Sequence, residues 1–411
     1  MSGNVILDVE FTRSFFPALN ESWSFLENAG GTLVPTTVVN RVAAYMTETQ
    51  VQPGTEFDAS RIAAERMEEG REFMAAMINA KAGEIAIGPS TTNNVYVLAN
   101  ALRPWFADGD EVIVTNVDHE ANNGAWRRYA DTGLSVREWR MDSETCELRI
   151  EDLQALLTDR TRLVCFTACS NIIGTVNDVA AIAKLVHDAG ALVCVDGVAF
   201  TPHRAVDVKE LDVDFYLYSI YKVFGPHAAV LYGKPEHLAR LENQNHYFVD
   251  GNPYLMLSPG GPNHELTAGA VGVSDYFDVL YDHHFGDEPT DIRKKMERLF
   301  GLFADHEARL SAPLVQYLSA KPGLRLFGLS TADMEKRVAV FSFVADGRDS
   351  TEIATRMQNK GAGLRSGDFY AARCIDGLGV RPQNGVIRAS LVHYNTPADV
   401  ERLIECLDEE V

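Results

Sequence analysis

A single lysine lies in the middle of an apolar and aromatic stretch, residues 214–233, which read DFYLYSIYKVFGPHAAVLYG. Burying the ammonium group of Lys222 unpaired in such surroundings would cost several kcal/mol. Desolvation lowers the pKa of a lysine, however, and a neutral lysine amine is a nucleophile toward carbonyl groups. The competing interpretation is a lysine that snorkels or pairs with an acid at a strand edge, so the rest of the sequence must decide.

A second polar residue, Asp196, ends an apolar run in the segment ALVCVDG. This pattern places the acid at the carboxyl end of a predicted parallel strand, where open α/β sheets bind ligands. A buried carboxylate there needs a cationic partner. An Asp on a protonated pyridine nitrogen, beside a Lys Schiff base, is the pairing expected of a pyridoxal phosphate site. Taken alone, Asp196 is equally compatible with a surface loop after a strand.

Two further groups of polar residues follow predicted strands. In IGPSTTNNVYVLANAL, the hydroxyls and backbone N–H groups of Thr91 and Thr92 would cradle a phosphate at a helix N-terminus. In DEVIVTNVDHEANNGAW, His119 could stack on a planar ring. Taken alone, the threonines are a weak signal, because Ser and Thr caps are common, and a capping or surface role is the favoured interpretation of His119. Together with Asp196 and Lys222, they are explained by one planar, phosphorylated cofactor that carries a carbonyl group.

The elements that position these residues alternate between β-rich and helical runs from about residue 84. Strands are predicted at 84–88, 110–116, 135–140, 162–169, 191–197, 215–219 and 228–233, and helices at 91–102, 150–157 and 178–190. Several strands are apolar on both faces, as in a sheet covered on both sides. The alternation predicts an α/β fold with a mostly parallel seven-stranded sheet.

The alternation of predicted strands and helices changes after about residue 290. A long helix is predicted at 291–320, followed by strands at 324–328, 338–344 and 386–392 and by helices at about 350–360 and 397–408. This pattern predicts a large domain of residues 21–290 and a smaller α+β domain of residues 1–20 and 291–411. No low-complexity linker separates the two domains, so we expect them to dock closely.

Composition excludes some classes of protein. The chain of 411 residues is 46% hydrophobic, and its net charge of -21 argues against nucleic-acid binding, which needs clustered Lys and Arg. No secretory signal or stretch long enough for a transmembrane helix is evident, so we expect a cytoplasmic protein with reduced thiols. Cys165 and Cys169 have the spacing of a metal pair, but no second pair or His cluster accompanies them. We therefore expect core packing and no metal site.

The sequence resembles the pyridoxal-phosphate enzymes of fold type I, specifically the class V aminotransferase group that contains cysteine desulfurases and selenocysteine lyases. The motifs DHEANNGAW, VCVDGV and SIYK come in the family's order and spacing, and the resemblance runs from FLENAGGTLVP to the last helix. It implies that Lys222 holds the cofactor as a Schiff base and moves the Cα proton of an α-amino acid. It also implies that Asp196 pairs with the pyridine nitrogen and that His119 stacks on the ring.

The resemblance further implies a phosphate site shared across a homodimer. The partner subunit would contribute through a Gly-rich turn, here SPGGPNHELTAG. The phosphate ligands implied in this way are Thr91, Thr92, His203 and Ser219 of one chain, and Asn263 and His264 of the other.

The resemblance also implies that the substrate's carboxylate binds Arg388, in GVIRASLVHYNT, and that Asn28 and Ala29 line the same site. A guanidinium fork suits the two-point grip on an amino-acid carboxylate. Arg365, in the turn LRSGDFYAARC, has two open interpretations, as the receptor of a second acidic group or as a structural residue.

The sequence departs from the family at two positions. Tyr370, which we expect in the substrate site, stands where desulfurases carry the cysteine that takes up sulfur, and a phenol cannot form a persulfide. Cys374 follows in helical sequence about one turn further along, and its substitution for the missing cysteine is the less favoured interpretation. Ala199 stands where the family usually has Gln or His near the ring's phenolic oxygen.

These observations predict a cysteine-desulfurase-like lyase without a persulfide. It would remove a β-substituent from an α-amino acid, by C–S cleavage or by β-decarboxylation or desulfination of an aspartate-like substrate, with C–C bond formation also conceivable. An aminotransferase or an amino-acid epimerase is the alternative on the same cofactor. A non-catalytic protein that kept the fold is a third hypothesis, from another class.

Overall fold

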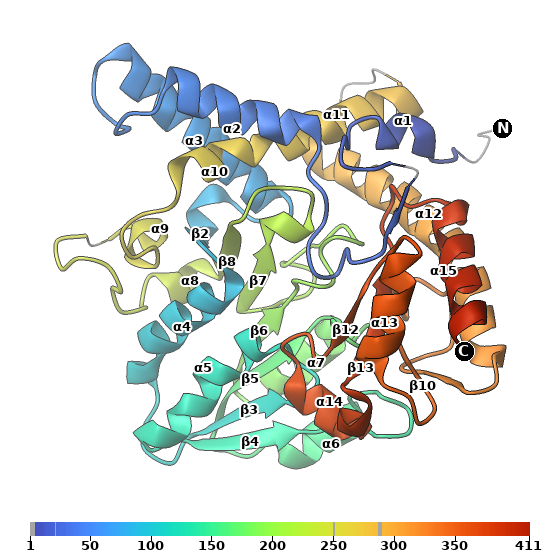
Figure 1. The fold of residues 1–411 in the computed structure, drawn as a ribbon. Helices are drawn as coiled ribbons and strands as arrows, with labels where there is room; N and C mark the ends of the chain where they lie inside the picture. The colour runs from blue at the N-terminus through green and yellow to red at the C-terminus, as the bar shows by residue number, and fades with distance from the viewer. Residues whose placement is uncertain (1–4, 21, 250, 287–289) are drawn as a thin grey trace.

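A seven-stranded sheet forms the centre of the described part of the chain, which comprises residues 5–20, 22–249, 251–286 and 290–411 of this computed structural model (Figure 1). The strand order is β2-β8-β7-β6-β5-β3-β4, and β8 runs antiparallel to both its neighbours while the other pairs are parallel. The strands are β2 (Ile85–Gly88), β3 (Glu111–Thr115), β4 (Ser135–Trp139), β5 (Thr161–Thr167), β6 (Leu192–Asp196), β7 (Phe215–Ser219) and β8 (Ala229–Gly233). Each overlaps a range predicted as a strand, and the mostly parallel sheet is confirmed.

Helices cover both faces of this sheet. Helices α4 and α5 contribute to the core on one face, whereas α3, α6, α7 and α11 contribute to the core on the other. The helices before residue 286 are α1 (Val9–Arg13), α2 (Thr36–Glu48), α3 (Asp58–Ala76), α4 (Thr91–Leu102), α5 (Gly124–Arg127), α6 (Ile150–Leu156), α7 (Val179–Asp188), α8 (Pro235–Leu238), α9 (Pro253–Met256), α10 (His264–Gly269) and α11 (Val271–Phe285).

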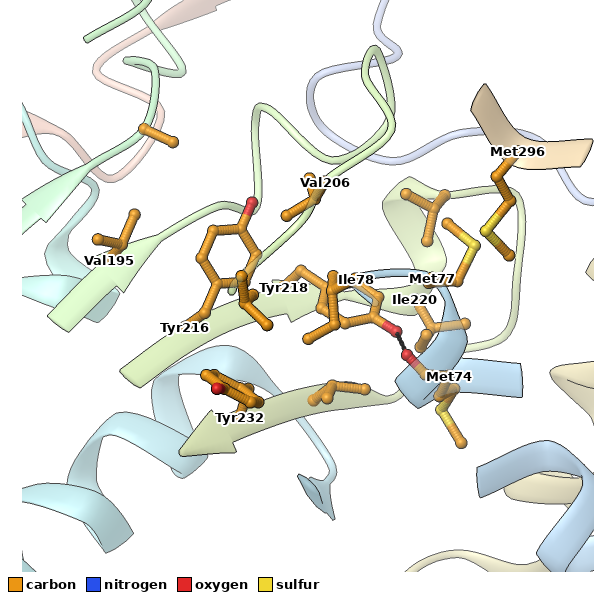
Figure 2. Packing of buried hydrophobic residues seen from close by; sticks show 14 of the residues in the cluster. Met74, Met77, Ile78, Val195, Val206, Tyr216, Tyr218, Ile220, Tyr232 and Met296 are labelled. Carbon is orange, nitrogen blue, oxygen red and sulfur yellow. Dashed lines mark hydrogen bonds between the residues drawn. The ribbon is translucent and has the colours of Figure 1, made fainter. Parts of the chain in front are cut away.

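Strand β7, which leads to the lysine, alternates its side chains between the two cores. Phe215 and Leu217 lie in the core beneath α4, whereas Tyr216 and Tyr218 lie in the opposite core. Figure 2 shows these tyrosines among aliphatic and methionine side chains, and the phenol of Tyr218 donates a hydrogen bond to the backbone carbonyl of Met74. Buried tyrosines are stabilised when the hydroxyl finds such a partner, so the strand is held rigidly on both faces.

A smaller antiparallel sheet with the order β12-β13-β10-β9 follows in the last part of the chain. Its core is shared with the long helix α12 and with α13 and α15. The elements are α12 (Ile292–Ala320), β9 (Leu324–Leu326), β10 (Val340–Ala345), α13 (Ser350–Asn359), β12 (Arg365–Gly367), α14 (Ala372–Leu378), β13 (Val386–Ser390) and α15 (Pro397–Glu410). A short parallel pair, β1 (Ser24–Phe25) with β11 (Ala362–Gly363), ties the start of the chain to this sheet.

The N-terminal segment contacts both predicted domains. The ring of Phe16 lies 5.3 Å from that of Tyr276 in α11 and 4.7 Å from that of Tyr394, which follows β13.

The predicted boundary near residue 290 adjoins residues 287–289, which lie outside the described residues. The assignment of residues 1–20 and 291–411 to one domain and 21–290 to another therefore stays a prediction.

No helix in the described ranges is long and apolar enough to cross a membrane. All six cysteines are unpaired and buried.

Candidate active site

Two adjoining cavities lie at the carboxyl ends of the parallel strands. The inner cavity has about 480 Å³ of space free of protein atoms and the outer cavity about 690 Å³, and both volumes include space open to solvent. The inner cavity is lined by Ser90, Thr91, Thr92, His119, Ala121, Thr167, Cys169, Asn171, Asp196, Val198, Ala199, Ser219, Tyr221 and Lys222. The outer cavity shares five of these residues and adds Glu27, Ala29, Gly30, Arg365, Phe369, Tyr370 and Arg388. Six of the predicted cofactor residues thus meet in one cavity.

Lys222 ends a single 3-10 turn, Ile220–Lys222, directly after β7. The backbone N–H groups of Val223 and Gly225 both donate to the carbonyl of Ile220, at 2.9 and 3.0 Å, and hold this turn. The lysine is buried, and burial together with the charge of Arg388 lowers its pKa. This shift favours the neutral amine, which is the form that a nucleophile or a base requires.

Asp196 is the last residue of β6 and is buried beside Lys222. Its Oδ1 accepts a hydrogen bond from the N–H of Val198 at 2.8 Å. Burial raises its pKa, while the backbone N–H and the charge of Lys222 act in the opposite direction. Packing requires the glycine of the VDG motif, because a Cβ at Gly197 would overlap the ring of Tyr216. The carboxylate is therefore positioned to stabilise a cation in the cavity.

His119 presents an uncharged imidazole to both cavities. Its Nδ1 accepts a hydrogen bond from the N–H of Ala121 at 3.0 Å, which assigns the ring proton to Nε2. Burial, reinforced by the charges of Lys222 and Arg388, lowers its pKa to about 3. Its ring lies 5.6 Å from that of Tyr370. A neutral ring in this place can cover a planar ligand without adding a charge.

The N-terminus of α4 faces the inner cavity. Ser90 caps this 12-residue helix by accepting a hydrogen bond from the N–H of Asn93, and Thr91 Oγ1 lies 2.8 Å from Ser219 Oγ. The two hydroxyls come from different elements and meet where the free N–H groups of the helix begin. Hydroxyls and N–H groups at a helix N-terminus are typical ligands of a phosphate.

Arg388, in β13, is buried on the wall of the outer cavity. Its Nη2 pairs with Glu27 Oε1 at 2.8 Å, and its Nη1 donates to the carbonyl of Asn171 at 3.1 Å. The guanidinium lies 3.8 Å from the centre of the Phe369 ring. Burial raises the pKa of Glu27, against the charges of Arg388 and Arg365. This arrangement can bind a carboxylate that enters the outer cavity.

Arg365 and Tyr370 line the outer cavity, and Tyr370 is 72% exposed. Phe369 and Tyr370 both have left-handed backbone conformations, with φ of 49° and 57°. The carbonyl of Phe369 accepts from Asn171 Nδ2 at 3.1 Å, and that of Tyr370 accepts from the N–H of Glu120 at 2.7 Å. Because such conformations are unfavourable for bulky residues, these contacts are needed to hold the turn over the cavity.

Some predicted site residues lie elsewhere. His203 lines neither cavity, and its buried ring pairs through Nδ1 with Glu307 Oε2 at 2.9 Å. The amide of Asn28 also points into the protein, where it donates to the carbonyl of Ser390 at 2.7 Å. Asn263 caps α10 and is followed by His264; their role across a dimer interface stays a prediction.

Cys374 does not reach the site. It lies in α14, is fully buried and lines neither cavity. Burial raises the pKa of its thiol, so the reactive thiolate is disfavoured. The interpretation in which Cys374 takes the place of the family's cysteine has no support in this arrangement.

Sequence reasoning missed Glu27, Asn171, Tyr221 and Cys169 as cavity residues. Cys169 was expected only in the core, and it is fully buried but also lines the inner cavity. Asn171 has a buried Oδ1 without a hydrogen-bond partner among the described residues, and this atom is available to a ligand because Asn171 lines both cavities. The polar pair that follows β5 in TACSN was the available signal for Asn171. No sequence signal indicated the pairing of Glu27 with Arg388, because the two residues are far apart in the chain.

The comparisons with known proteins agree with this geometry. The model of the family "Aminotransferase class-V" matches residues 24–247 and 299–403, so the chain belongs to the class V aminotransferase family. The aminotransferase-like protein FGM3 of Gibberella zeae is 38% identical over 97% of this chain and 98% of its own length. The cysteine desulfurase-like protein ustD of Aspergillus flavus is 33% identical, over 99% of this chain and 91% of its own length. The crystal structure of the cysteine desulfurase CsdA from Escherichia coli matches with a TM-score of 0.83 at 26% identity, covering 98% of each chain.

The protein is therefore a pyridoxal-phosphate-dependent enzyme of fold type I, similar to cysteine desulfurases. The cavity walls fit this cofactor. A buried carboxylate suits a protonated ring nitrogen, a buried amine suits the aldehyde, and a helix N-terminus with two hydroxyls suits the phosphate. Ala199 lines the inner cavity, and its methyl group offers no hydrogen bond.

Proposed function

We propose that this enzyme is a lyase that removes a β-substituent from an α-amino acid without a cysteine persulfide. The reactions included are C–S cleavage and the β-decarboxylation or desulfination of an aspartate-like substrate, after which the freed Cβ could form a C–C bond. One contrast carries the proposal. Lys222, Asp196 and Arg388 converge on adjoining cavities, whereas the position of the sulfur-accepting cysteine is held by Tyr370 and the nearest following cysteine is buried away from both cavities.

Each residue has a defined task in this proposal. Pyridoxal 5'-phosphate, when bound, supplies an aldehyde for amines and a ring that stabilises negative charge at Cα. Asp196 keeps the ring nitrogen protonated, and the neutral ring of His119 covers the site and excludes water. Arg388 orients the substrate through its carboxylate. The amine of Lys222, whose pKa is lowered by burial, accepts the Cα proton and returns it.

A homodimer with shared active sites accompanies the proposal. Asn263 and His264 start α10 and lie outside both cavities of their own chain, which leaves them free to serve the partner's phosphate site. A mixture of one inactive variant at Lys222 with a second at Asn263 and His264 should regain activity in hybrid dimers. A protein that stays monomeric in light scattering would contradict this part. The cytoplasmic location likewise stays a prediction.

The function is tested by proton NMR in deuterated water, using the pyridoxal-phosphate-loaded protein with cysteine, cysteine sulfinate and aspartate. We expect alanine from cysteine sulfinate or aspartate, because loss of SO2 or CO2 leaves an electron pair on Cβ that takes up a proton. Cysteine should give pyruvate instead, because without a persulfide its sulfur leaves as hydrosulfide together with the C–S electron pair. Lys222→Ala should abolish the reaction, whereas Lys184→Ala, at an exposed lysine paired with Asp188, is the matched control. Full turnover in Lys222→Ala would refute the proposal. Deuterium at Cα without alanine or pyruvate would instead favour a transaminase or an epimerase.

A further inference from the structure

Glu27 occupies part of the space that a bound carboxylate would need. Its Oε1 lies 2.8 Å from Nη2 of Arg388, and its side chain is 14% exposed. Its Oε2 is buried and has no hydrogen-bond partner among the described residues. The protein thus places a carboxylate of its own against the arginine that is proposed to receive the substrate's carboxylate.

Arg388 retains capacity for a second partner. Its side chain is 2% exposed, and its Nε has no hydrogen-bond partner within the described ranges. The Nη1 group is bound to a backbone carbonyl, that of Asn171, which carries no net charge. Glu27 is therefore the counter-charge of a buried guanidinium that is incompletely satisfied, and a buried cation without its anion is strongly destabilised.

The neighbouring glycine makes room for this ion pair. A Cβ at Gly30 would overlap Oε1 of Glu27, and Gly30 does not have a positive φ. The small residue is therefore explained by space for the carboxylate and not by the backbone conformation. Two other cations, Arg365 and Lys222, act on the same carboxylate from different elements, so Glu27 has a second basic partner available in the outer cavity.

We propose that Glu27 is an exchangeable counter-ion, which a substrate carboxylate displaces from Arg388, and that Glu27 thereby sets the affinity of the site for carboxylates. This inference rests on the proposed role of Arg388 as the carboxylate receptor. The displaced side chain stays in the outer cavity, where Arg365 compensates its charge. Binding then exchanges one carboxylate for another, so the site gains less than the full energy of a new ion pair.

The test measures the binding of propionate, a carboxylate without an amino group, to the pyridoxal-phosphate-loaded protein by titration calorimetry. In Glu27→Gln the guanidinium has no anionic competitor, and we expect the Kd of propionate to fall about tenfold or more. Gly30→Ala displaces the carboxylate of Glu27 without changing the charge, and it should shift the Kd in the same direction by a smaller factor. Glu48→Gln, which removes the acid from an ion pair with Arg66 on α2 and α3, should leave the Kd unchanged.

Melting temperature provides a second readout. Glu27→Gln should melt lower than the parent protein without ligand and should gain more from saturating propionate, because the ligand restores the missing anion. A Kd that is unchanged or higher in Glu27→Gln would overturn the inference and assign Glu27 to the positioning of Arg388. Absence of propionate binding in every variant would also overturn it. Neither result depends on turnover, so failure of the proposed lyase reaction would be recognised separately.

Discussion

Replacing Asp214 with Asn tests how the sheet beneath the active site is held. This carboxylate is 3% exposed. Its Oδ2 lies 2.8 Å from both the N–H of Val193 and Nε2 of His187, and its Oδ1 lies 2.8 Å from Nε2 of His237 and 3.2 Å from the ammonium of Lys234. These partners belong to β6, to α7 and to the segment after β8, so one side chain joins several elements.

The magnitude follows from the pKa of this carboxyl group. Hydrogen bonds from the two histidines and from the Val193 N–H, with the charge of Lys234, outweigh burial and lower the pKa of Asp214 from 3.8 to about 2. A carboxyl group whose pKa is lower in the folded state stabilises the protein at pH values above its unfolded-state pKa. This stabilisation is lost as the pH falls through the folded-state pKa. The contribution is about 2 kcal/mol at pH 7 and falls to about 1 kcal/mol at pH 3.

The assay is the free energy of unfolding in urea, measured at several pH values for the parent protein and for Asp214→Asn. We expect the variant to be destabilised by about 2 kcal/mol at pH 7, with the difference shrinking by about 1 kcal/mol at pH 3. Asp188→Asn, at an exposed pair with Lys184, should change little at either pH. A difference between parent and Asp214→Asn that stays constant from pH 7 to pH 3 would refute the electrostatic reasoning.

Three further outcomes are expected. Gly197→Ala should lower the free energy of unfolding by about 1–3 kcal/mol or more, because its Cβ would overlap the buried ring of Tyr216; an unchanged urea midpoint would contradict this packing. Cys374→Ala should retain alanine formation in the NMR assay, because the thiol lines neither cavity, and a folded but inactive variant would be evidence for a persulfide. Arg388→Lys should raise the KM for amino-acid substrates by about tenfold or more, since an ammonium cannot replace a guanidinium fork; an unchanged KM in steady-state kinetics would exclude Arg388 as the carboxylate receptor.

Much of the inner cavity could be predicted from the sequence. Asp196 ends a recognisable strand, His119 and Lys222 each follow one, and parallel strands bring their carboxyl ends to one edge of a sheet. The position of each polar residue relative to its strand is a local property, readable from the alternation of apolar and polar residues. The cofactor class therefore followed from sequence, and the family match bears it out.

The outer cavity was less predictable. The short strands β1, β11 and β12 carry too few residues for a periodic pattern, and the left-handed backbone of Phe369 and Tyr370 is not signalled by their residue types, since neither is glycine. The direction of a side chain was also not readable there. Asn28 and His203 stand near site residues in the chain, yet both side chains bind groups inside the protein.

What the sequence determined by itself was the set of chemical groups and the sheet that collects them, because strand periodicity and the residue at each strand end are encoded locally. Tertiary structure alone decided which charges meet. Glu27 and Arg388 are separated by 361 positions in the chain and form an ion pair, and Cys374 is close to the family's cysteine position in sequence but lies outside both cavities. The first contact depends on a bridge between Glu27 and Ser390 of β13, and the position of Cys374 depends on how α14 packs. No local pattern of residues specifies either arrangement.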